Sequence, residues 1–144
     1  MHITSIAFNN NDPVPPRYKG STNPPIDITD VPRHAKSLAL IMHDPDAVSG
    51  DYVHWTVWDI DPQTTTILED AIPSGATAGP TTTGMPGYIG PRPPSGSGRH
   101  HYTFELYALD TVLDLLPATP PDELAAAIAK HAVDKAVLIG VVDA

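Results

Sequence analysis

Proline is the residue that most limits what this chain can fold into. The 144 residues include 17 prolines and 10 glycines, spread over most of the sequence. Because proline fixes φ and lacks the N–H that a helix interior or a central strand needs, such a scatter breaks up long helices. Proline and glycine also favour turns. We therefore expect a mostly β protein with many loops, folded as a single domain over residues 1–144.

The chain is acidic, which limits the partners it can attract. It has 17 Asp and Glu residues against 8 Lys and Arg, a formal net charge of −9. Nucleic acid and anionic membranes bind positive surfaces, so neither is an expected partner, and any anion must be captured in a local pocket. The lack of cysteine excludes disulfides and thiolate metal sites. Residues 1–10 show no secretory signal and no apolar run is long enough to span a membrane, which predicts a cytoplasmic protein.

Hydrophobic patterning locates the main strands. Residues 37–43 form a continuous apolar run, as expected for a strand buried on both faces. Residues 54–60 are rich in aromatic and β-branched side chains, residues 102–109 alternate between two faces, and residues 136–142 have the composition of a closing strand. Weaker strand patterns occupy residues 2–8, 26–28 and 67–72, and the rest of residues 9–36 is predicted to be extended and irregular.

One helix is predicted, over residues 120–131. Thr119 is the expected N-cap and Pro120 the expected first helical residue, since both residue types favour these positions. An apolar face at helical spacing follows. The residues of that face are Leu124, Ala127, Ile128 and His131.

Polar residues gather where two of the predicted strands meet stiff turns, and a rigid scaffold commonly presents a site at such places. The first group is residues 43–46 (HDPD) with His54 at the start of the next strand, and the second is residues 87–102. Trp55 could line a pocket beside His54, whereas Trp58 falls on the opposite face of its strand and is expected in the core.

Each of these residues also has a purely structural interpretation. Asp44 and Asp46 flank a proline and could serve a turn, and His54 and His100 could each be a satisfied structural histidine. The functional alternative is that the two strands are neighbours, so that both imidazoles converge beside a carboxylate that sets one ring's tautomer. Such a group could bind a phosphate, a carboxylate or a metal ion. His101 should point away from His100 if the strand has already begun there.

Familiar catalytic and nucleotide-binding motifs are absent. The Gly- and Pro-rich residues 84–98 lack both the P-loop lysine and a GxGxxG pattern, and serve as a stiff surface loop or as the wall of a pocket. There is no HExxH and no pair of histidines four residues apart, so neither a metal site nor a cofactor is predicted. No serine lies in GxSxG, and Ser95 lacks the strand-to-helix context of a nucleophile, which argues against a serine hydrolase.

Two long segments resemble the signatures of the phosphatidylethanolamine-binding protein family. Residues 37–60, SLALIMHDPDAVSGDYVHWTVWDI, are similar to the first, a strand followed by Asp-Pro-Asp-Ala-Pro and then a strand that opens with His. Residues 87–109, GYIGPRPPSGSGRHHYTFELYAL, are similar to the second, Gly-Pro-x-Pro-Pro-x-Gly followed by His-x-Tyr. The C-terminal part resembles the bacterial and archaeal branch, which includes Raf kinase inhibitor-like proteins. The resemblance covers nearly the whole chain, in order.

This resemblance implies a fold and a site. The fold would be a large central antiparallel sheet with a smaller sheet packed on it and a C-terminal helix. A pocket at one end of the sheet would take phosphate-like groups, including phospholipid head groups. The ligand-binding residues that the motifs carry over are Asp44, His54, Pro93, Pro94, His100 and Tyr102, with Asp46, Trp55 and Gly90 in secondary roles. Three departures affect the rim: Val48 replaces the second motif proline, the insertion before His54 is short, which would leave the rim more open, and residues 81–85 (TTTGM) replace a stretch like Asn-Asp-Phe-Gly.

The leading functional hypothesis is a small soluble binding protein for an anionic ligand. The imidazoles of His54 and His100 and backbone N–H groups near residues 90–94 would bind the anion, and Asp44 would orient one ring. Anion affinity should then fall as pH rises. The alternative is a small hydrolase that uses His54 or His100 as general base, although no nucleophile is evident and no catalytic residue is assigned. Modulation of a kinase or protease, and a homodimer, stay open at this point.

Overall fold

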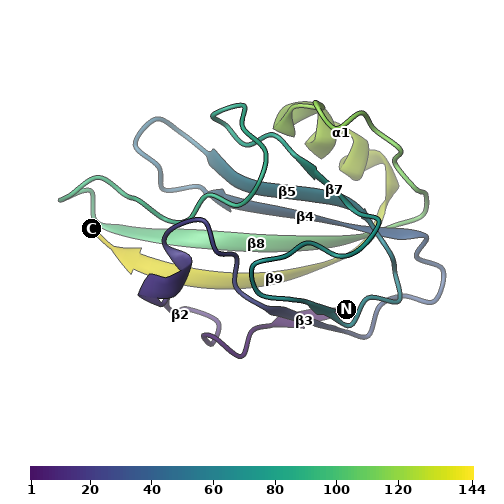
Figure 1. Ribbon diagram of the computed structural model, residues 1–144, viewed down its shortest axis with the longest axis horizontal. Coiled ribbons are helices and arrows are strands. Elements are labelled where there is room, and N and C mark those ends of the chain that lie inside the picture. Colours follow the sequence, from purple (N-terminus) through teal and green to yellow (C-terminus); the bar gives the residue numbers. More distant parts are fainter.

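The computed structural model, which describes all of residues 1–144, contains a six-stranded sheet and a three-stranded sheet (Figure 1). The larger sheet consists of β2 (Asp12–Pro13), β4 (Ser37–Asp44), β5 (Tyr52–Ile60), β7 (Thr77–Gly79), β8 (Arg99–Leu109) and β9 (Ala132–Asp143), in the order β2-β9-β8-β4-β5-β7. The smaller sheet consists of β1 (His2–Thr4), β3 (Ile26–Thr29) and β6 (Thr66–Ile67), in the order β1-β3-β6. All strand pairs are antiparallel except β2 with β9.

β4 lies near the middle of the large sheet, between β5 and β8. Seven of its eight residues are buried, which agrees with the continuous apolar run over 37–43. A strand in this position is covered on both faces, so apolar side chains are favoured at every position rather than at alternate ones. The core strand pairs β4–β8 and β8–β9 keep a regular register over most of their length.

The large sheet separates two hydrophobic cores. The larger core lies between the two sheets and includes Leu40, Trp55 and Phe104. The smaller core lies on the other face under the helix α1 (Pro121–His131), where Leu124 and Trp58 are fully buried. Burying one such side chain contributes roughly 1.5–3 kcal/mol. Each face of the sheet therefore has its own apolar layer, and the fold is stabilised from both sides.

Several predicted boundaries are wrong: two weak strands end earlier than predicted, whereas β5, β8 and β9 begin earlier, at Tyr52, Arg99 and Ala132 rather than at residues 54, 102 and 136. β1 ends at Thr4 rather than at residue 8, and β6 ends at Ile67 rather than at residue 72. Ile6 and Leu68 are 86% and 67% exposed, so the apolar residues in these two segments do not mark buried strand positions. The short strands β2 and β7 and the 3₁₀ helix at Pro16–Tyr18 were not predicted, because two or three residues carry no periodicity.

The start of α1 also differs from the prediction. Pro120 is the N-cap and the helix begins at Pro121, while the Thr119 hydroxyl donates to the Leu116 carbonyl instead of capping the helix. Asp122 and Glu123 in the first turn complement the positive end of the helix dipole in place of a side-chain cap.

A β-bulge in β5 determines where His54 points. Met42 pairs with Trp55 and His43 pairs with Val53, so His54 is an extra residue on β5. Strict alternation would place His54 on the opposite face from Trp55. A bulge re-aims a side chain, and here it brings His54 to the face on which Asp44 lies.

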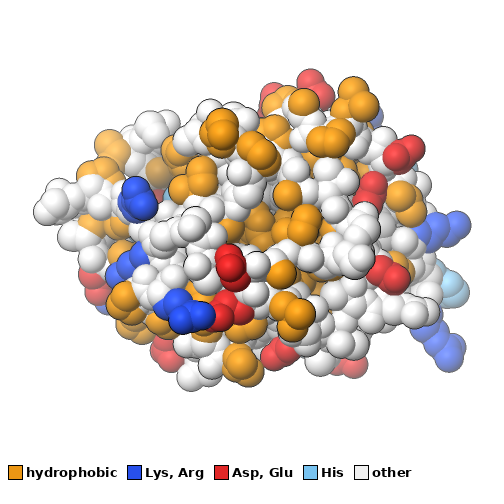
Figure 2. Space-filling view, viewed as in Figure 1, with side chains coloured by type: hydrophobic (Ala, Val, Ile, Leu, Met, Phe, Trp, Pro, Cys, Tyr) orange, Lys and Arg blue, Asp and Glu red, His pale blue; other side chains and the backbone are white.

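Charged side chains are unevenly spread over the surface. On the face shown in Figure 2, Lys and Arg lie toward the two ends of the molecule, and acidic side chains are spread between them and along the edges. No helix has the length and apolar character needed to cross a membrane.

Candidate functional site

A cavity of about 410 Å³ lies at the end of the large sheet where β4 ends and β5 and β8 begin. A cavity of this size suits a small ligand. The six residues that the motifs carried over as ligand-binding all line this cavity: Asp44, His54, Pro93, Pro94, His100 and Tyr102. Gly90, one of the secondary residues, lines it as well. The structure therefore brings together residues from three strands and one loop that are far apart in the sequence.

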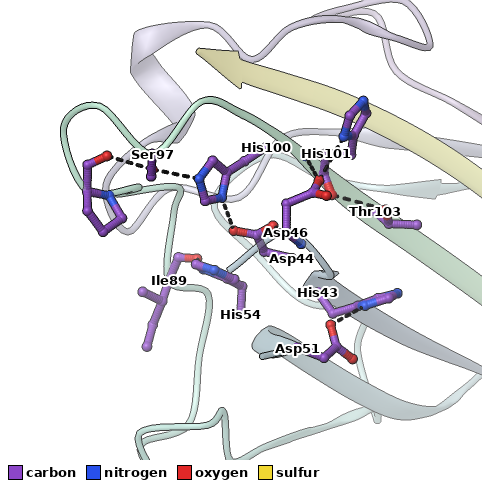
Figure 3. A network of polar contacts seen from close by, with 11 residues as sticks. His43, Asp44, Asp46, Asp51, His54, Ile89, Ser97, His100, His101 and Thr103 are labelled. Carbon is purple, nitrogen blue, oxygen red and sulfur yellow. Dashed lines mark hydrogen bonds and ion pairs between the residues drawn. The ribbon is translucent and has the colours of Figure 1, made fainter. Parts of the chain in front are cut away.

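A buried hydrogen-bonded series forms the base of the cavity (Figure 3). His100 Nδ1 lies 2.7 Å from Asp44 Oδ2, and both side chains are almost fully buried. The other oxygen of Asp44 accepts a hydrogen bond from the Asp46 N–H at 2.9 Å. Asp44 therefore also stabilises the turn that follows β4, as its structural interpretation predicts. His100 Nε2 lies 2.8 Å from the Ser97 hydroxyl, which itself donates to the Pro94 carbonyl at 2.6 Å. Ser97 was not predicted, because a serine in a Gly-rich loop carries no motif.

His54 is held in one tautomer by the loop opposite. Its Nδ1 donates to the Ile89 carbonyl at 2.7 Å. Its ring packs between Tyr52 and Tyr102, with centroid distances of 4.8 Å and 5.2 Å. Burial lowers the pKa of His54, which outweighs the opposite effects of the Ile89 carbonyl and of Asp44. His54 is therefore a neutral imidazole at pH 7 rather than a cationic donor.

Tyr102 adds a protonated hydroxyl to the same wall. Burial, followed by the negative charge of Asp44, raises the pKa of Tyr102 well above its usual range. The phenol ring stacks on His100 with centroids 6.3 Å apart. The Tyr102 hydroxyl therefore stays protonated and uncharged at neutral pH.

The backbone of the loop supplies fewer donors than predicted. The Ile89 N–H donates to the His54 carbonyl at 3.0 Å, and the Gly90 N–H donates to the Gly20 carbonyl at 2.7 Å. The prolines at 91, 93 and 94 have no N–H at all. The expected set of backbone N–H groups near residues 90–94 is thus reduced to that of Arg92, because folding of the loop uses the others.

Arg92 is the basic residue of the cavity wall. No other Lys or Arg lines the cavity, and Asp44 is the one acidic residue that does. Asp44 is paired with His100, whereas no hydrogen bond or ion pair to another residue is found for Arg92. Arg92 occupies the variable position of the Gly-Pro-x-Pro-Pro motif, so its role could not be inferred from the family pattern.

Two of the secondary residues lie elsewhere. Asp46 accepts hydrogen bonds from the backbone N–H and the ring of His101, at 2.8 Å and 2.7 Å, and does not line the cavity. His101 thus points away from His100, as its position in the strand predicts. Trp55 is in the larger core, where it packs edge-on against Tyr88, so the prediction that it lines the pocket is wrong. Trp55 pairs with Met42, and both side chains lie in the larger core rather than in the cavity lining.

The departures from the family pattern have different consequences. Val48 lines the cavity, and its side chain is 76% exposed, so it adds an apolar group to the rim. Residues 81, 82 and 84 line a different cleft on the other face of the sheet, so they are not part of this rim.

That second cleft is larger, at about 980 Å³, and lies between α1 and the loop around residue 82. Its ionisable groups include His43, Asp51 and Glu105. They pair with one another, with His43 2.7 Å from Asp51 and 3.3 Å from Glu105. The smaller cavity is the better candidate because Arg92 and His54 Nε2 are left available for a ligand there. No group of three or more His, Asp or Glu side chains is arranged to hold a metal ion.

The two-sheet architecture and the polar cavity at the strand ends define a class of small β-rich ligand-binding domains. The family model for phosphatidylethanolamine-binding proteins matches residues 4–143, and the chain belongs to that family. It is 41% identical over 148 residues to a UPF0098 protein of Methanothermobacter thermautotrophicus, with 97% of each chain covered.

Solved structures agree with this assignment. The chain superimposes on a phosphatidylethanolamine-binding protein homologue from Chlamydia trachomatis with a TM-score of 0.92 and 35% identity, covering 99% of this chain and 97% of the other. It superimposes on Escherichia coli YbcL with a TM-score of 0.94, covering 99% and 98%, and at 24% identity this likeness supports the fold alone. The predicted family and the predicted fold are confirmed.

Proposed function

We propose that this protein binds a small phosphate-like anion in the cavity at Asp44, His54 and Arg92. Membership of the family supports a small binding protein. The observation that carries the finer proposal is Arg92, an unpaired guanidinium on the wall of a cavity whose one carboxylate is already paired with His100. A guanidinium presents N–H groups in a planar fork that suits phosphate and carboxylate oxygens.

The proposal also fits the global charge. A protein of net charge −9 repels anions at long range, so binding depends on local contacts. Charge-assisted hydrogen bonds contribute about 1.5–3 kcal/mol each. Two or three such contacts give affinities from millimolar to micromolar, the range expected of an open cavity of this size.

A matched pair of arginine variants tests the proposal. Arg92→Gln removes the charge from the cavity wall, whereas Arg99→Gln removes the same charge from the Arg99–Asp143 pair outside it. We expect calorimetric titration with phosphoethanolamine to show about a tenfold weaker affinity for Arg92→Gln and little change for Arg99→Gln. The proposal fails if wild type does not bind, or if both variants bind as well as wild type.

A hydrolase is the second candidate, and the observation that favours it is Ser97. Ser97, His100 and Asp44 form the kind of hydrogen-bonded series that activates a serine nucleophile. Two observations favour binding instead: the Ser97 hydroxyl donates to the Pro94 carbonyl, and Ser97 does not line the cavity. Turnover of an ester or phosphoester panel that is lost in Ser97→Ala would establish the hydrolase, and the absence of turnover would leave the binding protein.

A further inference from the structure

The larger cleft, between α1 and the loop over residues 80–86, takes no part in the proposed function (Figure 1). Its volume of about 980 Å³ is at the upper end of the range for small-molecule sites. Side chains of the large sheet form its floor, and α1 and the loop form its two sides. The floor residues are Ile41, Val53 and Tyr107, and the sides include Pro80, Pro86, Pro120 and Pro121.

Both sides of the cleft are anchored, so the cleft is already formed without a ligand. Leu124 and Ile128 hold α1 in the smaller core. On the other side, the Thr82 N–H donates to the Val53 carbonyl at 3.0 Å, and the Thr82 hydroxyl accepts from the Val53 N–H at 2.8 Å. The prolines add stiffness, because each has a fixed φ. A ligand does not have to order these walls, which lowers the entropic cost of binding.

The cleft is acidic. Every lining residue belongs to residues 37–91 or 100–129, two stretches that contain no Lys or Arg. Three carboxylates line the cleft against one basic side chain. The carboxylates are those of Asp51, Glu105 and Asp122, and the basic side chain is His43. Lys135 reaches Glu105 from outside the lining, at 3.2 Å. Even with His43 protonated, two positive charges face three negative ones, and one negative charge stays uncompensated.

Two of these carboxylates have oxygen atoms available for a ligand. His43 Nδ1 lies 2.7 Å from Asp51 Oδ1, which leaves Oδ2 of Asp51 without a partner. Asp122, in the first turn of α1, forms no ion pair. Glu105, by contrast, is already bound by His43, Lys135 and Tyr107. A ligand in the cleft can therefore donate hydrogen bonds to Asp51 and Asp122 while it covers the apolar floor.

The surface around the cleft is also apolar and acidic. Met85 lies between two lining residues and Leu116 directly precedes the lining residue Pro117, and both apolar side chains are exposed. Along the upper edge of Figure 2, where Figure 1 places α1, hydrophobic and acidic side chains lie side by side. Contiguous exposed apolar surface commonly marks a binding site.

We propose that this cleft binds a small organic cation, an alkylammonium group attached to an apolar body. The proposal goes beyond the proposed function, because the face of the sheet and the sign of the ligand charge both differ. The ammonium donates to Asp51 and Asp122, and the apolar body packs on the floor. A neutral ligand would remove water from the same carboxylates without compensation, and an anion would be repelled. The net charge of −9 also attracts cations at long range.

Three probes that share one apolar body test the proposal. At pH 7, 4-phenylbutylamine is a cation, 4-phenylbutanol is neutral and 4-phenylbutyrate is an anion. We expect NMR titration of the isotope-labelled protein to show at least tenfold tighter binding of the amine than of the alcohol, and no binding of the butyrate in the cleft. The amide signals of Ala78, Thr82 and Ala125 should shift with the amine. Equal binding of all three probes, binding of none, or amine-induced shifts confined to residues around His54 and Arg92 would overturn the proposal.

Matched double variants separate the cleft from the overall charge. Asp51→Asn with Asp122→Asn removes two charges from the cleft, whereas Asp70→Asn with Asp114→Asn removes two exposed charges outside it. Asp70 and Asp114 have positive φ, which asparagine also tolerates. We expect the first pair to weaken amine binding about tenfold without changing alcohol binding, and the second pair to have little effect.

Asp122→Asn alone gives a second readout, because Asp51 also holds His43 and its replacement could disturb the fold. Asp122 has no such partner, so this variant should keep the wild-type stability and bind the amine about threefold more weakly. An equal loss of affinity in both double variants would show that net charge alone attracts the amine, and would overturn the proposal.

Discussion

Single residues decide whether the cavity can form, and Gly90 is the clearest case. A Cβ at this position would lie 2.4 Å from the Lys19 backbone carbon and 2.6 Å from the Tyr18 carbonyl oxygen. The backbone comes this close because the Gly90 N–H donates to the Gly20 carbonyl. Only glycine permits that approach, so the residue matters here for the space it leaves rather than for a contact with ligand.

Replacing Gly90 with alanine should therefore destabilise the protein and weaken phosphate binding. The clash is with backbone atoms, which cannot move aside as a side chain can, so we expect a loss of about 2–3 kcal/mol in urea unfolding. Gly20→Ala is the matched control, because a Cβ there has nothing within 4 Å and its φ is not positive. Similar unfolding curves for the two variants would contradict this explanation.

Between elements, charged side chains link the outer face of three adjacent strands. His43 on β4 lies 3.3 Å from Glu105 on β8, and Glu105 lies 3.2 Å from Lys135 on β9. Glu105, followed by Asp51, raises the pKa of His43 to about 9 against the effect of burial. His43 first, and then Tyr107 and Lys135, lower the pKa of Glu105 to about 2. His43 pairs with Thr103 and Lys135 pairs with Tyr107, so both ion pairs with Glu105 are diagonal contacts, which long side chains can still make across a strand pair.

The stability of the protein should depend on pH through this pair. Because the pKa of His43 is raised from 6.5 to about 9 by folding, its contribution is complete below pH 6.5 and is lost as pH rises through about 9. We expect His43→Gln to remove about 1–2 kcal/mol at pH 6 and much less at pH 10.

Urea unfolding of wild type and variant at several pH values measures this difference. His2→Gln is the control, since His2 and Asp30 form an exposed pair 3.7 Å apart. That variant should follow the wild-type dependence. A constant difference between wild type and His43→Gln from pH 6 to 10 would show that His43 stabilises by packing alone.

At the scale of the whole molecule, the cavity and the helix α1 lie on opposite faces of the large sheet. The cavity is built on the face of the larger core, whereas α1 packs on the other face over the smaller core. Asp44, His54, His100 and Tyr102, which line the cavity, are attached to strands whose positions the larger core fixes. The helix layer should then contribute to stability without taking part in binding at that cavity.

Leu124→Ala tests that separation. Leu124 is fully buried in the smaller core, so its truncation should cost about 2–5 kcal/mol of unfolding free energy. The folded variant should still bind phosphoethanolamine within about twofold of wild type. Ala129→Ser on the exposed side of α1 is the control and should cost only about 0.5 kcal/mol. Loss of binding in Leu124→Ala while the protein remains folded would show that the two faces are coupled.

Much of the fold was predictable from local pattern. The apolar run at 37–43, the alternation at 102–109 and the amphipathic spacing at 120–131 each reflect a period that one element must satisfy to bury its side chains. The family motifs added the cavity residues. The roles of Arg92 and Ser97 were not predictable, because one fills a variable motif position and the other a loop with no periodic constraint.

The sequence alone determined which segments must be buried and, through the family motifs, six of the residues that line the cavity, since hydrophobic period and residue type are local properties. The tertiary structure decided what that chemistry can do. The bulge opposite Met42 turns His54 into the cavity, and the contacts with Ile89, Asp44 and Ser97 leave a single ring nitrogen, that of His54, available to a ligand. Hydrogen-bonding capacity depends on which partners a fold has already supplied, and those partners are distant in sequence.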